Sequence, residues 1–544
     1  MNPNISADVE RVSNEVRRYK AGELGEEEWR RFRLQNGIYG VRFQKNIQMI
    51  RVKIPFGELT ADQLRVLGET AEIFSTGIGH VTTRQDIQFY WIALEAIPEV
   101  LRRLGEVDIT TREASGNTVR NVTACHLAGV CKKEQFDVTP YAKQVSRYLM
   151  RNPISQNLPR KFKIAFSGCG DDCVITGIND VGAIAVVKEV DGQKVRGFRI
   201  HVGGGLGTPP RVPYLIEDFT PAKDLLLTIE AVLRIFDRLG NRENTFRARM
   251  KFIIEQLGID EFRRVVQKER WTLRATKAGD PEMQIESAEK EKENMRYIMV
   301  KQPNRSIESE AVDAGFARWF KTNVVKQKQE GFYAVTVMLI GGDITARQLS
   351  LLADAAEKYS NGLVRTTIRQ NVVLRWIGSA DLHSLYQDLK KADLASPGAD
   401  TICDVVGCPG ADTCNLGVTR SHRLAMKLSE HLAASDNLML NEDFKGVSIK
   451  VSGCPNACGQ HHVATIGFFG SAQRIKGKMV PHYHLVMGGK VYDGSVRFGD
   501  IMMMIPAKKV PEAVSKILDT YRAQRQDGES FQSWVDRLFS ERGE

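Results

Sequence analysis

The feature that most constrains the fold of this chain is an internal repeat. Residues 57–92 and 342–377 align without a gap at an offset of 285 positions, and 15 of the 36 aligned residues are identical. Each copy contains a polar turn, a stretch with apolar residues at helical spacing, and then an alternating, strand-like run. The repeat indicates an ancient duplication. We therefore predict a mixed α and β fold, α/β in class, made of two halves related by a pseudo-twofold axis.

Eight of the nine cysteines extend the repeat as two quartets. In each half, two cysteines with five residues between them precede two with three residues between them: Cys125, Cys131, Cys169 and Cys173 in the first half, and Cys408, Cys414, Cys454 and Cys458 in the second. Four thiolates are the usual ligands of a [4Fe–4S] cluster. Zinc sites bring cysteines closer together in the sequence than the five-residue spacing does. The quartets therefore predict iron–sulfur sites, with small buried core residues as the alternative.

The two halves differ in positive charge. When the cysteines are used as anchors, the first half carries four cationic residues of which the second half keeps one. The four are Arg84, Arg120, Lys161 and Lys163, and their counterparts are Arg369, Cys403, Gly446 and Ser448. Lys161 and Lys163 alternate with apolar residues in the strand-like run KFKIAF, so both are expected on one face. Arg and Lys suit an oxyanion, and we predict an anion site built by the first half only.

Composition narrows the function class further. The chain has 544 residues and a net charge of +10, but its Lys and Arg residues are interleaved with acidic ones rather than gathered in blocks. This pattern argues against a nucleic-acid partner and is compatible with an acidic electron-donor protein. No run of apolar residues is long enough to cross a membrane, and the polar N-terminus does not resemble a signal peptide. We expect a cytoplasmic protein, and the charged segment 268–300 is predicted to link the halves.

Six motifs in order then resemble those of the sirohaem-containing sulfite and nitrite reductases, particularly the single-chain ferredoxin-dependent kind. They are TTRQDIQ (82–88), GNTVRNV (116–122), NLPRKFKIA (157–165), HVGGGLG (201–207), Cys408 with Cys414, and SGCPNACGQ (452–460). The resemblance implies a three-domain architecture with the cofactors at the domain junction. It implies ferredoxin-like half-domains at 1–115 and 291–395, each followed by a sirohaem-binding domain, at 116–290 and 396–544.

The resemblance also implies roles for the site residues. The second-half quartet would hold a [4Fe–4S] cluster, and the sulfur of Cys458 would also be the axial ligand of the sirohaem iron. Arg84, Arg120, Lys161 and Lys163 would surround the face where substrate binds, and Arg84 and Arg120 would also help to hold the cofactor. The expected activity is the six-electron reduction of sulfite to sulfide, as in sulfur assimilation, with electrons from ferredoxin or another acidic donor protein.

Two alternatives remain open at this point. Family members devoted to nitrite tend to have Asn where Lys163 stands, which favours sulfite here, but reduction of nitrite to ammonia is the alternative. An electron carrier with two clusters and no sirohaem is a second one. The first-half quartet departs from the better-known members of the family. It is expected either to hold a second cluster or to be an unliganded remnant of the duplication.

Overall fold

Both copies of the repeat fold as a helix followed by a β-hairpin, as the sequence predicts. The structure is a computed structural model and describes residues 1–276, 313–435 and 438–541. The first copy forms α3 (Ala61–Phe74), β4 (Ile78–Val81) and β5 (Ile87–Ala93); the second forms α11 (Ala346–Tyr359), β14 (Leu363–Thr366) and β15 (Val372–Gly378). Each helix begins with a capping box, Thr60 with Gln63 and Thr345 with Gln348. Such boxes satisfy N–H groups that the first helical turn leaves free.

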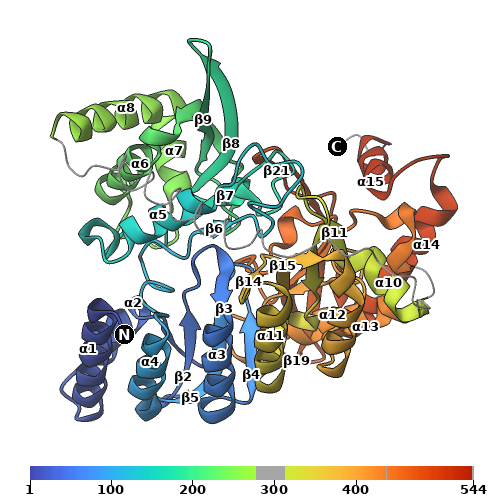
Figure 1. The fold of residues 1–544 in the computed structure, drawn as a ribbon, viewed down its shortest axis with the longest axis horizontal. Coiled ribbons are helices and arrows are strands. Elements are labelled where there is room, and N and C mark those ends of the chain that lie inside the picture. The colour runs from blue at the N-terminus through green and yellow to red at the C-terminus, as the bar shows by residue number, and fades with distance from the viewer. Residues whose placement is uncertain (277–312, 436–437, 542–544) are drawn as a thin grey trace.

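The two halves exchange a short strand. One sheet has the order β1 (Ile38–Gly40), β2 (Ile47–Val52), β5, β4 and β13 (Asp343–Thr345), and the other has the order β11 (Val324–Lys326), β12 (Phe332–Val337), β15, β14 and β3 (Glu58–Thr60). Each sheet thus ends in a strand from the other half. Helices α3 and α11 lie side by side (Figure 1), and residues of both halves share one apolar core. The repeats therefore form one central body.

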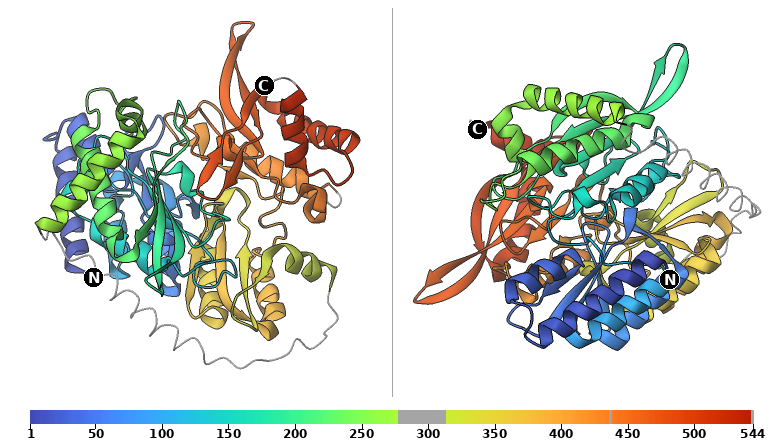
Figure 2. Two further views of the ribbon diagram at one scale, coloured as in Figure 1. Left: turned by 90° about the horizontal axis from the view of Figure 1, so that it is seen from above. Right: turned by 90° about the vertical axis from the view of Figure 1, so that its left-hand side faces the viewer.

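Each cysteine quartet belongs to a further sheet with three parallel strands followed by antiparallel ones. The first contains β6 (Thr123–Ala124), β7 (Ile164–Ser167), β8 (Val181–Val190), β9 (Gln193–Val202) and β10 (Tyr214–Pro221); the second contains β16 (Val406–Gly407), β17 (Ile449–Ser452), β18 (Ile466–Ile475), β19 (Lys478–Met487) and β22 (Asp500–Pro506). The hairpins β8–β9 and β18–β19 project from the molecule in different directions (Figure 2), as expected for related halves.

Helices cover these sheets. The first Cys-bearing sheet packs with α5 (Thr139–Leu149), α6 (Leu225–Leu239), α7 (Met250–Leu257) and α8 (Ile259–Ala275), and the second with α13 (Ser421–Ala433), α14 (Val510–Gln524) and α15 (Phe531–Glu541). The central body adds α1 (Pro3–Lys20), α2 (Glu26–Gln35), α4 (Ile97–Glu106), α10 (Ala314–Asn323) and α12 (Leu382–Lys391). In the described ranges, no helix combines the length and the hydropathy needed to cross a membrane.

Two local expectations need correction. The predicted linker 268–300 begins too early, because residues up to Ala275 continue α8, where Phe262, Val266 and Leu273 are buried at helical spacing. The remainder of that segment from residue 277, and the predicted domain boundary at 290, lie outside the described residues. The strand expected over KFKIAF begins only at Ile164, after the two lysines. The four-segment division of the chain stays a prediction.

Candidate functional site

The second-half quartet lies where two parallel strands end. Cys408 directly follows β16 and Cys454 follows β17, and the Cys408 N–H donates to the Val451 carbonyl at 3.1 Å. The N–H of Gly453 donates to Cys408 Sγ at 3.2 Å. Burial and the nearby Cys458 together raise the pKa of Cys408 to about 12. Such a thiol becomes a thiolate only when a cation or metal takes the proton's place.

The four sulfurs of the second-half quartet lie near one another. Cys408, Cys414 and Cys454 each interact electrostatically with Cys458. Over the described ranges, the only three metal-ligating side chains with their ligand atoms all within 4.8 Å of one another are His80, Asp343 and His422. The cysteine sulfurs are therefore spread more widely than around a single ion. A [4Fe–4S] cluster, in which each thiolate binds a different iron, fits this donor set.

The four cations of the first half gather on the same quartet. Lys161 and Lys163 precede β7, and both interact electrostatically with Cys458. Burial, together with the neighbouring Arg120 and Arg249, lowers the pKa of Lys161 to about 8, although Cys458 opposes this shift. Burial, Lys161 and Arg84 together place the pKa of Lys163 well below its ordinary value. Crowded cations of this kind require an anion or water between them.

The hydrogen bonds of these cations leave donors free. Arg84 donates from Nη1 to Asn179 Oδ1 at 2.7 Å and from Nη2 to the Ile164 carbonyl at 3.0 Å, while its buried Nε has no partner. Burial lowers the pKa of Arg84 to about 9. No hydrogen bond or ion pair to a described residue holds the ammonium group of Lys161 or Lys163, and both side chains are only half-buried. An anionic macrocycle and an oxyanion substrate fit such unsatisfied donors.

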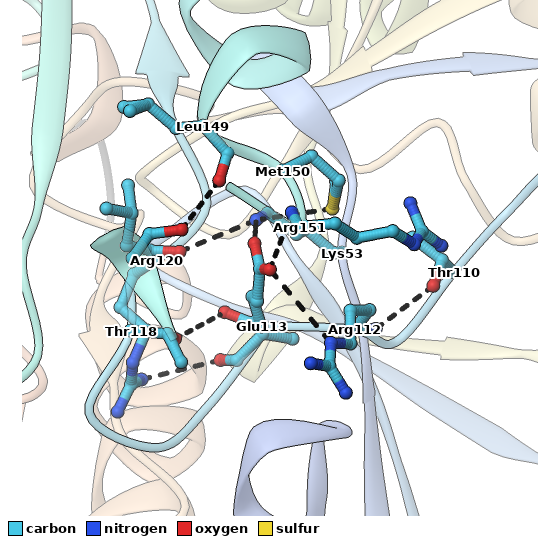
Figure 3. A network of polar contacts seen from close by, with 12 residues as sticks. Lys53, Thr110, Arg112, Glu113, Thr118, Arg120, Leu149, Met150 and Arg151 are labelled. Atoms are coloured by element: carbon cyan, nitrogen blue, oxygen red, sulfur yellow. Dashed lines mark hydrogen bonds and ion pairs between the residues drawn. The ribbon is translucent and has the colours of Figure 1, made fainter. Parts of the chain in front are cut away.

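The loop that carries Arg120 is fixed by a buried ion pair. Lys53 Nζ lies 3.3 Å from Glu113 Oε2, and both side chains are almost fully buried. Glu113 also accepts from the Arg151 backbone N–H at 2.8 Å and faces Arg112 (Figure 3). Arg120 donates from Nε and Nη2 to the Gly116 carbonyl of the same loop, at 3.0 and 2.8 Å. The guanidinium is therefore held in place by its own loop.

The second quartet is also joined directly to the first half. Thr83, beside Arg84 in the TTRQ turn, donates to the Cys458 carbonyl at 3.0 Å. A small apolar group at the same junction combines residues from both Cys-bearing segments and the second repeat: Ile175, Ile178, Leu206, Ile368, Ala457, Val463 and Val496. The predicted cluster ligands and the predicted cations thus meet at one junction, although they come from distant parts of the chain.

Three residues at this junction were not predicted from the sequence. Arg51 donates to the Tyr39 hydroxyl at 3.1 Å and interacts electrostatically with Cys458. Burial would raise the pKa of Tyr39, but Arg51, Arg120 and Lys161 outweigh it and lower the pKa to about 8. Arg249 pairs with Asp180 at 2.8 Å and lies near Lys161 and Lys163.

A signal for Arg51 was present in the sequence. The offset of 285 pairs Arg51 with Thr336 and Lys53 with Met338, which is the same loss of charge that marks Arg120, Lys161 and Lys163. Tyr39 and Arg249 lie outside the well-aligned segments, so the comparison of the halves offers no counterpart for them.

In the second half, the position equivalent to the cation site carries an arginine whose charge is neutralised by acidic residues. Arg369, the counterpart of Arg84, lies 3.1 Å from Asp400 and 3.5 Å from Asp404. Cys403, the counterpart of Arg120, is fully buried, and burial raises the pKa of its thiol to about 11. Among the described residues, the cation set of Arg84, Arg120, Lys161 and Lys163 therefore has no full counterpart around Arg369.

Comparison with known proteins agrees with this arrangement. The nitrite and sulphite reductase 4Fe-4S domain matches residues 115–274 and 398–541, and the nitrite/sulfite reductase ferredoxin-like half domain matches residues 43–107 and 325–392. The assimilatory ferredoxin-dependent nitrite reductase of Haloferax mediterranei is 29% identical over 505 residues, which cover 91% of this chain and 82% of that protein. Sulfite reductase (ferredoxin) 1 of Mycolicibacterium paratuberculosis is 27% identical over 500 residues, with coverage of 91% and 82%.

The fold has a solved counterpart as well. The structure of the Mycobacterium tuberculosis NirA protein superposes with a TM-score of 0.77 at 25% identity and covers 94% of this chain and 91% of that one. The class defined by fold and site is an iron–sulfur oxidoreductase made of two fused, duplicated halves. The chain belongs to the nitrite and sulfite reductase family. The predicted cofactors of that family, sirohaem and a [4Fe–4S] cluster, are thereby confirmed.

Proposed function

We propose that this protein reduces sulfite to sulfide at a sirohaem coupled through Cys458 to the [4Fe–4S] cluster of the second-half quartet. The observation that carries the proposal is the convergence of Arg84, Arg120, Lys161 and Lys163 on one another, with both lysines interacting with Cys458. The cluster ligands would be Cys408, Cys414, Cys454 and Cys458. Sirohaem, when bound, supplies the iron and the electron pathway for the redox chemistry.

The side chains supply charge and protons. Arg84 and Arg120, fixed by carbonyl and amide partners, would act as stationary donors to the substrate oxygens and to the acidic groups of the cofactor. Lys161 and Lys163 would hold the remaining oxygens and pass protons to the oxygen that leaves as water. A lysine whose pKa is lowered to about 8 gives up a proton readily at neutral pH.

Sulfite is preferred to nitrite because of Lys163. Sulfite carries more negative charge and one more oxygen than nitrite, so it gains more from a fourth cation. Reduction of nitrite to ammonia is the second candidate, because ferredoxin-dependent nitrite reductases stand among the similar proteins beside sulfite reductases. A reduced ferredoxin or another acidic protein is the proposed donor, in keeping with those names and with the net charge of +10.

Product analysis tests the proposal. Purified holoprotein with a reduced viologen as donor is supplied with sulfite, and sulfide is measured against sulfite consumed. We expect stoichiometric sulfide, and loss of most of it in Arg120→Ala. Ammonia from nitrite without sulfide from sulfite would establish the second candidate instead. Absence of a sirohaem absorption band, with two clusters present, would identify an electron carrier.

A further inference from the structure

The first-half quartet has the same backbone frame as the second-half cluster site. Cys125 directly follows β6, as Cys408 follows β16, and the N–H of Cys125 donates to the Phe166 carbonyl at 3.1 Å. The N–H of Cys131 donates to the Leu127 carbonyl at 2.9 Å, and that of Cys414 to the Gly410 carbonyl at the same distance. Cys169 and Cys454 each accept at their carbonyl from the residue three positions later. The two frames therefore share these backbone hydrogen bonds.

The four thiols of the first half also converge. Cys173 Sγ lies 2.9 Å from Cys125 Sγ. Cys131 and Cys169 share a second thiol–thiol hydrogen bond. Cys169 interacts electrostatically with Cys125 and Cys173, so the two pairs are neighbours. A separation of 2.9 Å is too long for a disulfide, whose sulfurs lie about 2.0 Å apart.

Two buried arginines contact the loop between the first two cysteines of this quartet. Arg365 and Arg375 both donate to the Ala128 carbonyl, at 3.1 and 3.0 Å, inside the loop between Cys125 and Cys131. Arg365 is fully buried and also lies 3.5 Å from the Cys125 carbonyl. A [4Fe–4S] cluster with four thiolates carries net negative charge, and buried positive charge beside it stabilises that state. Both arginines also pair with Glu58, at 3.0 and 3.4 Å, so they offset only part of such a charge.

From these observations we infer that Cys125, Cys131, Cys169 and Cys173 hold a second [4Fe–4S] cluster. This inference goes beyond the proposed function, which needs only the second-half quartet. Because the counterparts of three of the four cations are absent around Arg369, the second cluster stands without a second substrate site. The turn between Cys169 and Cys173 contacts the second half directly, since the N–H of Asp493 donates to the Gly170 carbonyl at 3.1 Å.

Metal and sulfide content per chain tests the inference. Anaerobically purified holoprotein is analysed for iron, zinc and acid-labile sulfide, each normalised to sirohaem and to protein. Two clusters predict about eight sulfides per chain and about eight iron atoms besides that of sirohaem. About four sulfides in protein that is fully loaded with sirohaem would overturn the inference, whether zinc or disulfides then account for the remaining thiols. Neither count depends on sulfite or nitrite turnover, so failure here leaves the proposed function untouched.

Matched variants locate the second cluster. In the double variant Cys131→Ser with Cys169→Ser, sulfide should fall by about half while the sirohaem band remains. Cys403→Ser, which removes a buried thiol outside both quartets, is the control and should leave sulfide unchanged. Unchanged sulfide in a folded, sirohaem-loaded double variant would contradict the inference. Should the double variant not fold, the wild-type sulfide count decides alone.

Discussion

Among single residues, we expect Lys161 and Lys163 to govern how the site responds to pH and to substrate charge. Lys161 lies near Arg120 and Arg249, and Lys163 lies near Arg84 and Arg249. Neither ammonium group has a hydrogen-bond partner among the described residues. On a protein surface, lysine ammonium groups are hydrated, but here burial and the neighbouring positive charges lower the pKa of each. The cost of this crowding is offset only when anions enter the site.

The first prediction concerns proton supply. The pKa of Lys161 is lowered to about 8, so the side chain is protonated below that pH and loses its proton above it. We expect kcat/KM for sulfite to fall at pH values above about 8, or somewhat higher because bound anions favour the protonated form. Lys161→Gln should remove this fall and lower activity at neutral pH by about tenfold or more.

The control for this prediction is Tyr39→Phe, because the pKa of Tyr39 is also lowered to about 8. The alkaline fall should persist in that variant. A profile that flattens in Tyr39→Phe and stays unchanged in Lys161→Gln would assign the titration to the tyrosine and contradict the role given to the lysine. Steady-state rates across the pH range, with the same reduced viologen, provide the measurement.

The sequence predicted the key residues of the site because duplication provides an internal reference. Arg120, Lys161 and Lys163 stood out through their unlike counterparts, and the structure brings them together with Arg84, with both lysines near Cys458. Tyr39 and Arg249 could not be found in this way, since their place depends on chain packing between α2 and β2 and on the pairing of Arg249 with Asp180, just before β8. The role of each residue stays a prediction.

Among elements, the exchanged strands β3 and β13 hold the halves together, and a glycine precedes each of them. Gly57 has φ +76°, and a Cβ there would lie 2.5 Å from the Thr366 carbonyl oxygen; Gly342 has φ +78°, and a Cβ would lie 2.8 Å from the Val81 carbonyl oxygen. Only glycine combines this backbone conformation with so close an approach. The strand exchange thus depends on both positions.

The second prediction tests this dependence. Gly57→Ala should destabilise the protein by about 3 kcal/mol, because positive φ and the clash with Thr366 add together. Gly362→Ala is the matched control, since Gly362 has φ +71° with open space around it, and should cost only about 1 kcal/mol. Urea unfolding of both variants gives the difference. Equal losses would show that the close approach does not matter.

The third prediction concerns the group formed by His80 of β4, Asp343 of β13 and His422 of α13. His80 Nδ1 lies 2.8 Å from Asp343 Oδ1, and His422 Nε2 lies 3.2 Å from Asp343 Oδ2. Gln370, whose amide is fixed by the Gly407 N–H and the Val81 carbonyl, donates to His80 Nε2. The hydrogen of His80 is therefore on Nδ1, which favours a hydrogen-bonded relay over a metal site.

This group makes stability depend on pH. Burial would lower the pKa of His422, but Asp343 outweighs it and leaves the pKa raised; burial would raise the pKa of Asp343, but the two histidines hold it below its usual range. Because its pKa is raised, protonated His422 stabilises the fold, and this stabilisation is fully present below about pH 6.5. It is lost as the pH rises through the pKa that His422 has in the folded state. Because its pKa is lowered, ionised Asp343 stabilises the fold above about pH 4.

We expect His422→Gln to lower the free energy of unfolding by about 2 kcal/mol near pH 6 and by less at pH 9, measured by urea unfolding at both pH values. An equal loss at both would contradict the relay.

At the scale of the whole molecule, the duplication explains both the fold and its asymmetry. The repeat predicted two related halves, and the structure adds that they exchange strands and share one core, which no local pattern in either half reveals. Residues 268–275 show the limit of such patterns. They belong to the highly charged helix α8, whose few apolar residues are recognised as a buried face only in the folded structure. The two quartets keep similar frames, while Arg120, Lys161 and Lys163 have no cationic counterparts beside the first one.

The fourth prediction tests the central claim, that the cation set around Cys458 selects sulfite. The measurement is kcat/KM for sulfite and for nitrite, side by side, in wild-type holoprotein and in Lys163→Asn. We predict that wild type prefers sulfite and that the variant lowers the sulfite-to-nitrite ratio by about tenfold or more, as expected for loss of one charge-assisted hydrogen bond. A wild-type preference for nitrite, with a ratio that Lys163→Asn leaves unchanged, would contradict it.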